Sequence, residues 1–229
     1  MRKPIVAIDG TAASGKSTTA QRVAEHFQYR YVDTGAMYRA VTLKALQEGI
    51  DPTDSLALSN LVDNVDIHVE QQNGRIRVFL DQLDVTEQIR SPEVTQHVSA
   101  VSDIPHVREV LVTKQRELGK EGGIVMEGRD IGTVVFPHAD VKVYMVADSH
   151  ERARRRQQEL GQQARDIKSE KMEKSIVQRD TWDSLRIHSP LQRAPDAQLL
   201  DTTHLSIDEQ VKVVVHKIER ILRQNTRGS

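Results

Sequence analysis

Apolar and polar residues in the N-terminal part of the chain follow the pattern of strands alternating with helices. The fully apolar run Ile5-Val6-Ala7-Ile8 ends in Asp9-Gly10, which is typical of a short strand buried on both faces of a sheet. We expect the first four elements to be a strand at 5–8, a helix from 16 to about 26, a strand at 31–33 and a helix at 35–48, with Gly49 in the C′ position. Strands and helices in alternation indicate an α/β fold with a parallel sheet.

The middle of the chain departs from this alternation. Apolar residues at 67–69 and 76–80 alternate with polar ones on either side of Asn73-Gly74. Asn-Gly between two such runs favours a β-hairpin, because both turn residues must adopt positive φ. Ser91-Pro92 suits the N-cap and N1 positions of a helix, and a longer helix is expected from Pro105 to the Gly122-Gly123 pair. A hairpin between helical stretches indicates an inserted subdomain.

The pattern of a parallel sheet returns in the C-terminal part of the chain. We expect buried strands at 124–126 and 141–147, a helix capped by Asp148 or Ser149, a polar and exposed helical segment at about 161–186, a short strand at 199–200 and a final helix. The capping box Ser206-Ile207-Asp208-Glu209 opens that final helix.

The turn between the first strand and the first helix carries a phosphate-binding motif. The pattern G-x-x-x-x-G-K-[ST] is matched in full by Gly10, Thr11, Ala12, Ala13, Ser14, Gly15, Lys16 and Ser17. In such a loop the backbone N–H groups surround phosphate oxygens, the lysine reaches the β- and γ-phosphates, and the serine hydroxyl ligates Mg2+. The following helix, which includes Thr18, points its positive end at the same anion. The strand before and the helix after favour a site for ATP with Mg2+ over a glycine turn with a surface lysine.

The rest of the chain distinguishes among proteins that carry this motif. Neither D-x-x-G nor N-K-x-D, which a GTPase would normally contain, occurs in the 229 residues. A transport or motor ATPase would usually be longer and would have coupling domains. A kinase needs a second set of cations for its acceptor and for the transferred phosphoryl group. The chain offers such cations at Arg39, Arg108, Arg129, Arg179, Arg186 and the cluster from Arg152 to Arg156.

Composition narrows the function further. The chain has 32 basic and 33 acidic residues, a net charge of −1 and only 3% aromatic residues. This balance argues against a nucleic-acid coat or a polybasic membrane binder, and it disfavours an RNA-binding role for the arginine-rich helix. The absence of cysteine excludes disulfides, thiolate metal sites and cysteine nucleophiles. Because no stretch approaches the roughly 20 apolar residues of a membrane helix, and none resembles a signal peptide, we expect a soluble, cytoplasmic protein.

Three further motifs make a family resemblance specific. They are Asp33-Thr34-Gly35-Ala36-Met37-Tyr38-Arg39, Glu127-Gly128-Arg129-Asp130-Ile131-Gly132-Thr133-Val134-Val135-Phe136-Pro137 and Arg179-Asp180-Thr181-Trp182-Asp183-Ser184-Leu185-Arg186. With the phosphate-binding motif they resemble, over nearly the whole chain, the bacterial cytidylate kinases of the nucleoside monophosphate kinase family. The resemblance implies a P-loop kinase with a five-stranded parallel sheet flanked by helices, an inserted monophosphate-binding subdomain and a helical lid. Residues 1–34, 101–148 and 186–229 would form the core, 35–100 the insert with its antiparallel hairpin, and 149–185 the lid.

The resemblance also implies a monophosphate site. Its residues would be Thr34, Arg39, Ser99, Arg108, Arg129, Asp130, Arg179, Asp183 and Arg186. The residue types suit a cytosine base, because the carboxylate of Asp130 can accept a hydrogen bond from the 4-amino group, while Ser99 and Arg108 can donate to the ring acceptors. Uracil presents an acceptor where cytosine presents a donor, so a carboxylate there should reject it.

The remaining residues are expected to bind phosphates and sugar. Forked donors for the acceptor phosphate would come from Arg39, Arg129 and Arg186. Asp183 with Arg179 resembles the sugar contact of the family. Three arginines share one helical face at i, i+3 and i+4, namely Arg152, Arg155 and Arg156. We expect them to close over the donor phosphates. The groups expected to carry catalysis are Lys16, Arg129, Arg155 and Arg186.

The expected reaction is transfer of the ATP γ-phosphoryl group to CMP or dCMP, which gives CDP or dCDP and ADP in pyrimidine metabolism. CMP, dCMP and ATP are the expected partners of a monomer that binds neither nucleic acid nor membrane.

Two alternative functions remain: a P-loop kinase for uridylate or a small metabolite, and a non-catalytic, RNA-associated nucleotide-binding module. Structural roles also stay open for Asp130, which can pair with Arg129, and for Asp33, which can cap a helix or contact nucleotide or magnesium through water.

Overall fold

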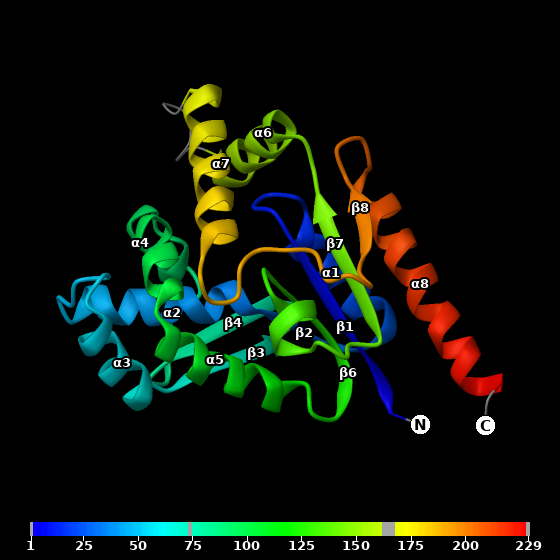
Figure 1. Ribbon diagram of the computed structural model, residues 1–229, viewed down its shortest axis with the longest axis horizontal. Coiled ribbons are helices and arrows are strands. Elements are labelled where there is room, and N and C mark those ends of the chain that lie inside the picture. Colours follow the sequence, from blue (N-terminus) through cyan, green and yellow to red (C-terminus); the bar gives the residue numbers. More distant parts are fainter. Residues whose placement is uncertain (1, 73–74, 162–167, 228–229) are drawn as a thin grey trace. The chain divides into compact units, whose positions relative to one another are not determined.

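The computed structural model describes residues 2–72, 75–161 and 168–227, and Figure 1 shows its ribbon. The larger sheet has five strands in the order β2-β6-β1-β7-β8. These strands are β1 (Lys3–Gly10), β2 (Arg30–Asp33), β6 (Gly122–Gly128), β7 (Val141–Val146) and β8 (Gln198–Asp201). The sheet is parallel and helices flank it, so the α/β fold predicted from the sequence is confirmed.

The chain folds into two compact units, the first of which consists of the described residues of 1–29 and 123–229. Its helices are α1 (Lys16–Phe27), α6 (Ser149–Leu160), α7 (Ser169–Leu185) and α8 (Ile207–Arg227), with a π-helical turn, η2, at Ile131–Val135. Every residue of β1 after Lys3 is buried, which explains its apolar run without alternation. The parallel pairing of β1 with β7 puts Gly10 opposite Met145.

The second unit comprises the described residues of 30–122 and combines helices with a small antiparallel sheet. Its elements are α2 (Thr34–Gln47), α3 (Ser55–Asn64), β3 (Ile67–Gln72), β4 (Arg75–Leu80), β5 (Leu83–Asp84), the 3-10 turn η1 (Gln88–Arg90), α4 (Pro92–Asp103) and α5 (Pro105–Leu118). The antiparallel register of β3 and β4 confirms the predicted hairpin, whereas its Asn73-Gly74 turn lies outside the described residues. The sequence pattern did not predict α3 or β5. Neither unit contains, among its described residues, a helix long and apolar enough to cross a membrane.

Three helix starts follow the capping chemistry expected from the sequence. The Ser91 hydroxyl accepts a hydrogen bond from the Val94 N–H at 3.3 Å before α4. The Asp148 carboxylate accepts the N–H two residues later at 2.9 Å before α6. At α8 the Glu209 N–H donates to the Ser206 hydroxyl at 3.3 Å, while the Ser206 N–H donates to the Glu209 carboxylate at 2.8 Å. These reciprocal bonds confirm the predicted capping box.

The end of α5 differs from its prediction. The helix ends at Leu118 with Gly119 as its C-cap, and the Gly119 N–H donates to the Arg116 carbonyl oxygen at 3.2 Å, which tightens the last turn. Gly122 and Gly123 do not end the helix; both have positive φ, of 72° and 63°, and they open β6. The prediction was wrong because the first glycine after the helix, and not the glycine pair, ends it.

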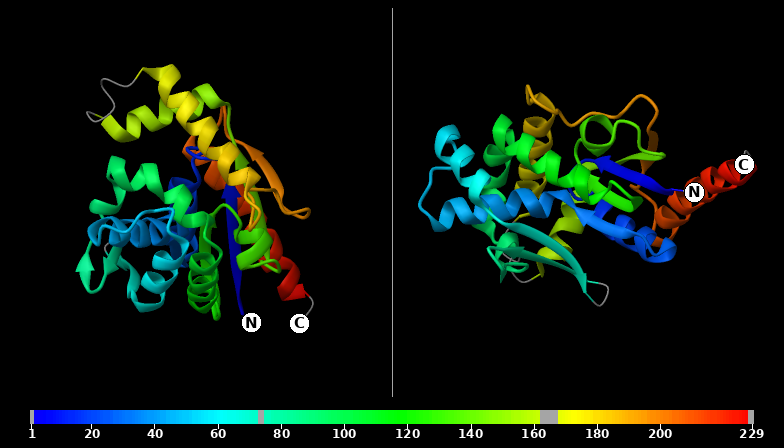
Figure 2. Two further views of the ribbon diagram at one scale, coloured as in Figure 1. Left: turned by 60° about the vertical axis from the view of Figure 1, so that its left-hand side comes forward. Right: turned by 90° about the horizontal axis from the view of Figure 1, so that it is seen from below.

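Helix α7 is less exposed than its polar sequence predicts. Met172, Ile176, Asp180 and Asp183 are buried, and their spacing of three or four residues puts them on one covered face. Part of that face packs against α6, and Figures 1 and 2 show the two helices, coloured yellow and yellow-green, side by side. The prediction of an exposed segment holds for most positions of α7 but misses this face, because two of the four buried positions are carboxylates, which do not register in a hydrophobic pattern. Residues 162–167 of the predicted segment lie outside the described residues.

Candidate active site

The phosphate loop, residues 10–17, joins β1 to α1 and approaches two other elements of the first unit. A Cβ atom on Gly10, whose φ is 145°, would lie 1.9 Å from the carbonyl oxygen of Met145 in β7. A Cβ atom on Gly15, whose φ is 95°, would lie 2.7 Å from Oε1 of Gln210 in α8. Close packing and backbone conformation both require Gly10, because its neighbour is backbone, whereas Gly15 is required mainly by its positive φ, because the atom that its Cβ would meet is the end of a side chain.

Lys16 is folded back over the phosphate loop. Its ammonium group donates to the Thr11 carbonyl oxygen at 2.6 Å and lies 3.5 Å from the Ser14 hydroxyl oxygen. The residue is only 5% exposed. Burial, followed by the positive charge of Arg129, lowers the pKa of Lys16 to about 7. Since its charged form is poorly solvated here, an incoming anion would stabilise that form strongly.

The first turn of α1 offers an anion site and exposed hydroxyl groups. Gly15 is the N-cap residue and supplies no side-chain cap, so the first N–H groups of the helix are left for another acceptor. Ser17 and Thr18 are exposed in this turn. Mg2+ takes oxygen ligands and is usually held by one or two protein groups plus phosphates, so the Ser17 hydroxyl fits as a protein ligand. Among the described residues, no group of three or more His, Asp or Glu side chains is placed to hold a metal ion.

Three of the arginines predicted to bind the substrate surround one buried carboxylate, that of Asp183. Asp183 accepts a hydrogen bond from Nε of Arg129 at 3.0 Å, and Nη1 of Arg186 lies 3.9 Å from its other oxygen. Burial alone would raise the pKa of Asp183, but Arg129, Arg186 and Arg179 together hold that pKa below its usual value. In this arginine cluster (Arg129, Arg179 and Arg186 around Asp183) three guanidinium groups face one carboxylate, and the carboxylates of Asp180 and Glu127 also act on Arg129.

Asp9, at the end of β1, anchors the segment that carries Arg129 and Asp130. Its carboxylate oxygens accept hydrogen bonds from the N–H groups of Ile131 at 2.8 Å and Gly132 at 2.7 Å, at the start of η2. Asp130 is buried directly before this turn. Burial raises the pKa of Asp9 to about 7, although both N–H bonds favour the charged form. Asp9 thus fixes the backbone next to two residues predicted to bind the substrate.

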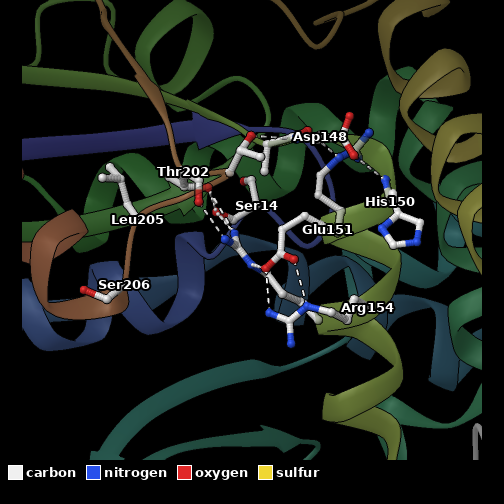
Figure 3. Close-up of polar contacts among 12 residues, drawn as sticks. Ser14, Asp148, His150, Glu151, Arg154, Thr202, Leu205 and Ser206 are labelled. Carbon is white, nitrogen blue, oxygen red and sulfur yellow. Dashed lines mark hydrogen bonds and ion pairs between the residues drawn. The ribbon is translucent and has the colours of Figure 1, made fainter.

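Two arginines of α6, Arg152 and Arg155, contact the phosphate loop directly. Arg155 donates to the Ser14 carbonyl oxygen at 3.4 Å, to the Thr202 carbonyl oxygen at 2.6 Å and to the Glu151 carboxylate at 2.9 Å. Figure 3 shows Ser14, Thr202 and Glu151 in this arrangement. Arg156 donates to Glu159 of the same helix at 2.8 Å.

Arg152 is the buried member of this set. Its Nε donates to the Ala147 carbonyl oxygen at 3.0 Å, and its Nη1 donates to the Ala12 carbonyl oxygen at 3.1 Å and to the Asp180 carboxylate. The Arg152 residue is only 7% exposed, so its charge faces these partners and not solvent.

The other residues predicted to bind the substrate lie in the second unit, on α2, α4 and α5; they are Thr34, Arg39, Ser99 and Arg108. Arg39 donates to the Thr95 hydroxyl oxygen at 3.0 Å. Arg108 is buried and donates to the Ser102 carbonyl oxygen at 3.0 Å, and its guanidinium carbon lies 5.3 Å from the centre of the Tyr38 ring. That distance is within the range of a cation–π interaction. Both arginines are therefore held by side chains and backbone of their own unit.

Asp33 caps α2, because its carboxylate accepts the Ala36 N–H at 3.1 Å. This is one of the two roles that the sequence left open. Thr34 follows as the first residue of the helix and is buried. Ser99 lies in α4, where its carbonyl oxygen accepts a hydrogen bond from the Ser102 hydroxyl at 3.0 Å.

Four buried polar residues that the sequence analysis did not assign to the site support the phosphate loop or the segment beside it: Asp9, Asp180, Thr202 and Gln210. The Thr202 hydroxyl donates to the Ser14 carbonyl oxygen at 2.8 Å, and Oε1 of Gln210 accepts the Thr19 hydroxyl at 2.9 Å. For Asp9 and Asp180 a signal existed, since each is a carboxylate within or beside a recognised motif. No local pattern marks Thr202 or Gln210, because their partners lie 188 and 191 residues earlier in the chain.

A protein-family model and two related proteins match this chain over nearly its full length. A family model described as cytidylate kinase matches residues 6–220. The chain is 50% identical to a cytidylate kinase of Limosilactobacillus reuteri (strain DSM 20016), over 96% of this chain and 95% of that protein. It is 48% identical to a cytidylate kinase of Chlorobaculum tepidum, over 98% of this chain and 97% of that protein. A gluconokinase structure from Sinorhizobium meliloti 1021 is similar in fold alone, with a TM-score of 0.51 and 13% identity over 100% of this chain and 99% of that one.

Replacing Asp9 by alanine is expected to lower the free energy of unfolding by about 2–3 kcal/mol, because the buried N–H groups of Ile131 and Gly132 lose their acceptor. Urea denaturation measures this loss. Asp54→Ala is the matched control, since Asp54 caps α3 through one exposed hydrogen bond, to the Ala57 N–H, and should cost about 1 kcal/mol. Equal losses in the two variants would contradict the anchoring role of Asp9.

Proposed function

Because this chain belongs to the cytidylate kinase family, we infer that it transfers the γ-phosphoryl group of ATP to CMP or dCMP, which gives CDP or dCDP and ADP. It is an ATP-dependent nucleoside monophosphate kinase of pyrimidine metabolism. The observation that carries this conclusion is a sequence identity of 48–50% to two cytidylate kinases, over nearly the full length of this chain and of each relative. We further propose a cytoplasmic monomer that binds neither nucleic acid nor membrane, in keeping with the net charge of −1.

The triphosphate of ATP is proposed to bind at the phosphate loop and Thr18. Backbone N–H groups of the loop and of the first turn of α1 supply donors, and Lys16 supplies charge to the β- and γ-phosphates. Arg152, Arg155 and Arg156 add positive charge from α6. The bonds from Arg152 and Arg155 to loop carbonyl oxygens support this assignment, because they keep both guanidinium groups beside the loop.

Ser17 is proposed as the protein ligand of Mg2+, with phosphate oxygens and water as the other ligands. A bound Mg2+ ion withdraws charge from the transferred phosphoryl group. The exposed hydroxyl in the first turn of α1 supports this role.

The phosphate and sugar of the acceptor are proposed to bind the arginine cluster of the first unit. Arg129 and Arg186 would offer forked donors to the phosphate, and Asp183 with Arg179 would bind the sugar hydroxyls. The support is the cluster itself, in which one carboxylate holds several guanidinium groups in place until an anion arrives.

In the second unit, Arg39 is proposed to bind the acceptor phosphate, with Thr34 as a further contact. Ser99 and Arg108 are proposed to donate to the ring acceptors of cytosine, and Asp130 to accept from its 4-amino group. The support is that Arg108 and Asp130 are buried polar residues whose donors and acceptors match those of cytosine.

The proposed mechanism needs no general base. An oxygen of the CMP phosphate, which is already ionised, attacks the γ-phosphorus while the bond to the β,γ-bridging oxygen breaks. Catalysis is then alignment and neutralisation of charge, for which we propose Lys16, Arg129, Arg155 and Arg186. Closure of the lid, residues 149–185, would exclude water from the γ-phosphate. Residues 35–100 would form the insert, and 1–34, 101–148 and 186–229 the core.

A panel of acceptors tests the function. With Mg-ATP, strong turnover is expected for CMP and dCMP alone among CMP, dCMP, UMP, AMP, GMP and dTMP, measured as ADP formed per acceptor. Equal or better use of UMP or AMP would favour another P-loop kinase. ATP binding without turnover of any monophosphate, joined with salt-sensitive retention on RNA, would favour the RNA-associated module.

Asp130→Asn tests the base contact. An amide can present a donor where the carboxylate presents only acceptors, so the ratio of kcat/KM for CMP to that for UMP is expected to fall by about tenfold or more. Steady-state kinetics with both nucleotides measure the ratio. An unchanged ratio would contradict the assignment of Asp130 to cytosine.

The low pKa of Lys16 predicts proton uptake when ATP binds. In the free protein the pKa is about 7, and a bound triphosphate favours the charged form and raises it. At pH 8 the binding of ATP should therefore take up as much as about one proton, and the affinity for ATP should fall as pH rises above about 7. Calorimetry in two buffers with different ionisation enthalpies measures the uptake. Lys16→Met should show correspondingly less uptake; the same uptake in both proteins would mean that Lys16 is already charged before ATP binds.

A further inference from the structure

Both backbone polar groups of Ala12 in the phosphate loop are held by side chains of α6 and α7. The Ala12 N–H donates to Oδ1 of Asp180 at 2.9 Å, and its carbonyl oxygen accepts from Nη1 of Arg152 at 3.1 Å. The same Nη1 also donates to Asp180. The three residues therefore form a closed ring of hydrogen bonds that joins the loop to both helices.

This ring is charged and buried. Asp180 is 9% exposed and Arg152 is 7% exposed. Removing a carboxylate and a guanidinium group from water is costly, and such a pair seldom stabilises a protein more than apolar residues of the same size would. What the pair does supply is direction, because Arg152 donates to the Ala147 and Ala12 carbonyl oxygens as well as to one oxygen of Asp180, whose other oxygen accepts the Ala12 N–H. Bonds to several fixed partners permit few relative orientations. We therefore attribute the presence of this buried pair to the geometry that it imposes and not to a gain in stability.

Apolar packing accompanies the ring. Ala12 forms one buried cluster with Ala153 of α6 and with Met172 and Ile176 of α7, and Ala13 packs against this cluster. Ala13 has a φ of 57°, a left-handed conformation that is uncommon for alanine. The contacts of α6 and α7 thus bear on the part of the loop that contains this uncommon backbone conformation.

Asp180 also lies close to the groups that would act on phosphates. Its negative charge raises the pKa of Arg129 and opposes the lowering of the Lys16 pKa by burial. It follows Arg179 in α7 and precedes Asp183 by one helical turn, so the arginine cluster and the ring share one helix. A shift of α7 would move both.

We propose that Asp180 is a positioning residue for phosphoryl transfer, which locks α6 and α7 onto the phosphate loop through Arg152 and Ala12. The proposal rests on the proposed kinase function, because it concerns how the lid of that kinase is held. With the lock intact, Arg152 and Arg155 stay against the loop where the triphosphate is expected. Without it, α6 and α7 separate from the loop more often, ATP is bound less tightly, and water reaches the γ-phosphate.

Asp180→Asn tests the lock with little change of shape. The amide oxygen can still accept the Ala12 N–H, but the negative charge that holds Arg152 is lost. We expect the Kd for ATP, measured by calorimetry without an acceptor, to rise about tenfold, as for the loss of one charge-assisted hydrogen bond. We also expect the ratio of ATP hydrolysis without CMP to CMP phosphorylation to rise about fivefold or more.

Glu173→Gln is the matched control on the same helix. Glu173 accepts a hydrogen bond from the Ser149 hydroxyl at 2.5 Å, so it joins α7 to α6 without contacting the phosphate loop. Its Kd for ATP and its hydrolysis ratio should stay within about twofold of those of the unchanged protein. If Asp180→Asn lowers the melting temperature but leaves the Kd and the hydrolysis ratio unchanged, its role is structural and the proposal is wrong. Equal effects in the two variants would also overturn it, since any contact between the helices would then suffice.

A double-mutant cycle with Arg152→Met separates a lock from two independent contacts. If Asp180 and Arg152 act as one unit, the Kd for ATP of the double variant should be about equal to that of the single variant that binds ATP less tightly. If the fold-increases in Kd of the two single variants multiply in the double variant, the proposal is wrong. Should Asp180→Asn fail to fold, Arg152→Lys keeps the charge but loses the fork, and it should raise the Kd for ATP similarly. If the unchanged protein binds ATP but does not phosphorylate CMP, the proposed function fails, whereas the Kd values still decide the lock.

Discussion

A positive charge buried away from water is stable only beside a negative one, and the first unit of this enzyme is organised around that constraint. Asp183 holds the arginine cluster together, and Asp180 holds Arg152 against the phosphate loop. Two polyanionic nucleotides, which we propose to bind here, would require several cations in a small volume, and these cations repel one another in the free protein. Internal carboxylates keep them in place, which explains why acidic residues are buried beside the proposed anion sites.

Helix α7 links the two parts of this arrangement. Asp180 and Asp183 are three residues apart, so they lie on the same face of the helix. One bonds to the phosphate loop and the other to the arginine cluster. The composition, 32 basic residues against 33 acidic ones, does not show this arrangement, because a net charge is a sum over the whole chain. A net charge of −1 is therefore compatible with several arginines gathered in one place.

Much of the fold and part of the site were predictable because they depend on short stretches of chain. The apolar run of β1, the hairpin around residues 67–80 and the capping box at Ser206 each carry their signal within a few residues. The phosphate loop is defined by eight consecutive residues, and the match to a family adds the expected reaction. Local errors arose where two signals competed, as at Gly119, which ended α5 before the glycine pair did.

What the sequence by itself determined was the order of the elements, the phosphate-binding motif and the residue types available for two nucleotides. Only the tertiary structure decided which of those residues meet. Asp9 bonds to the backbone beyond Asp130, and Thr202 bonds to the carbonyl oxygen of Ser14, through contacts that span 122 to 188 positions of the chain. Such partners carry no periodicity and no fixed spacing. They are chosen by the packing of the parallel sheet and the helices around it, which brings together side chains that are remote in the sequence.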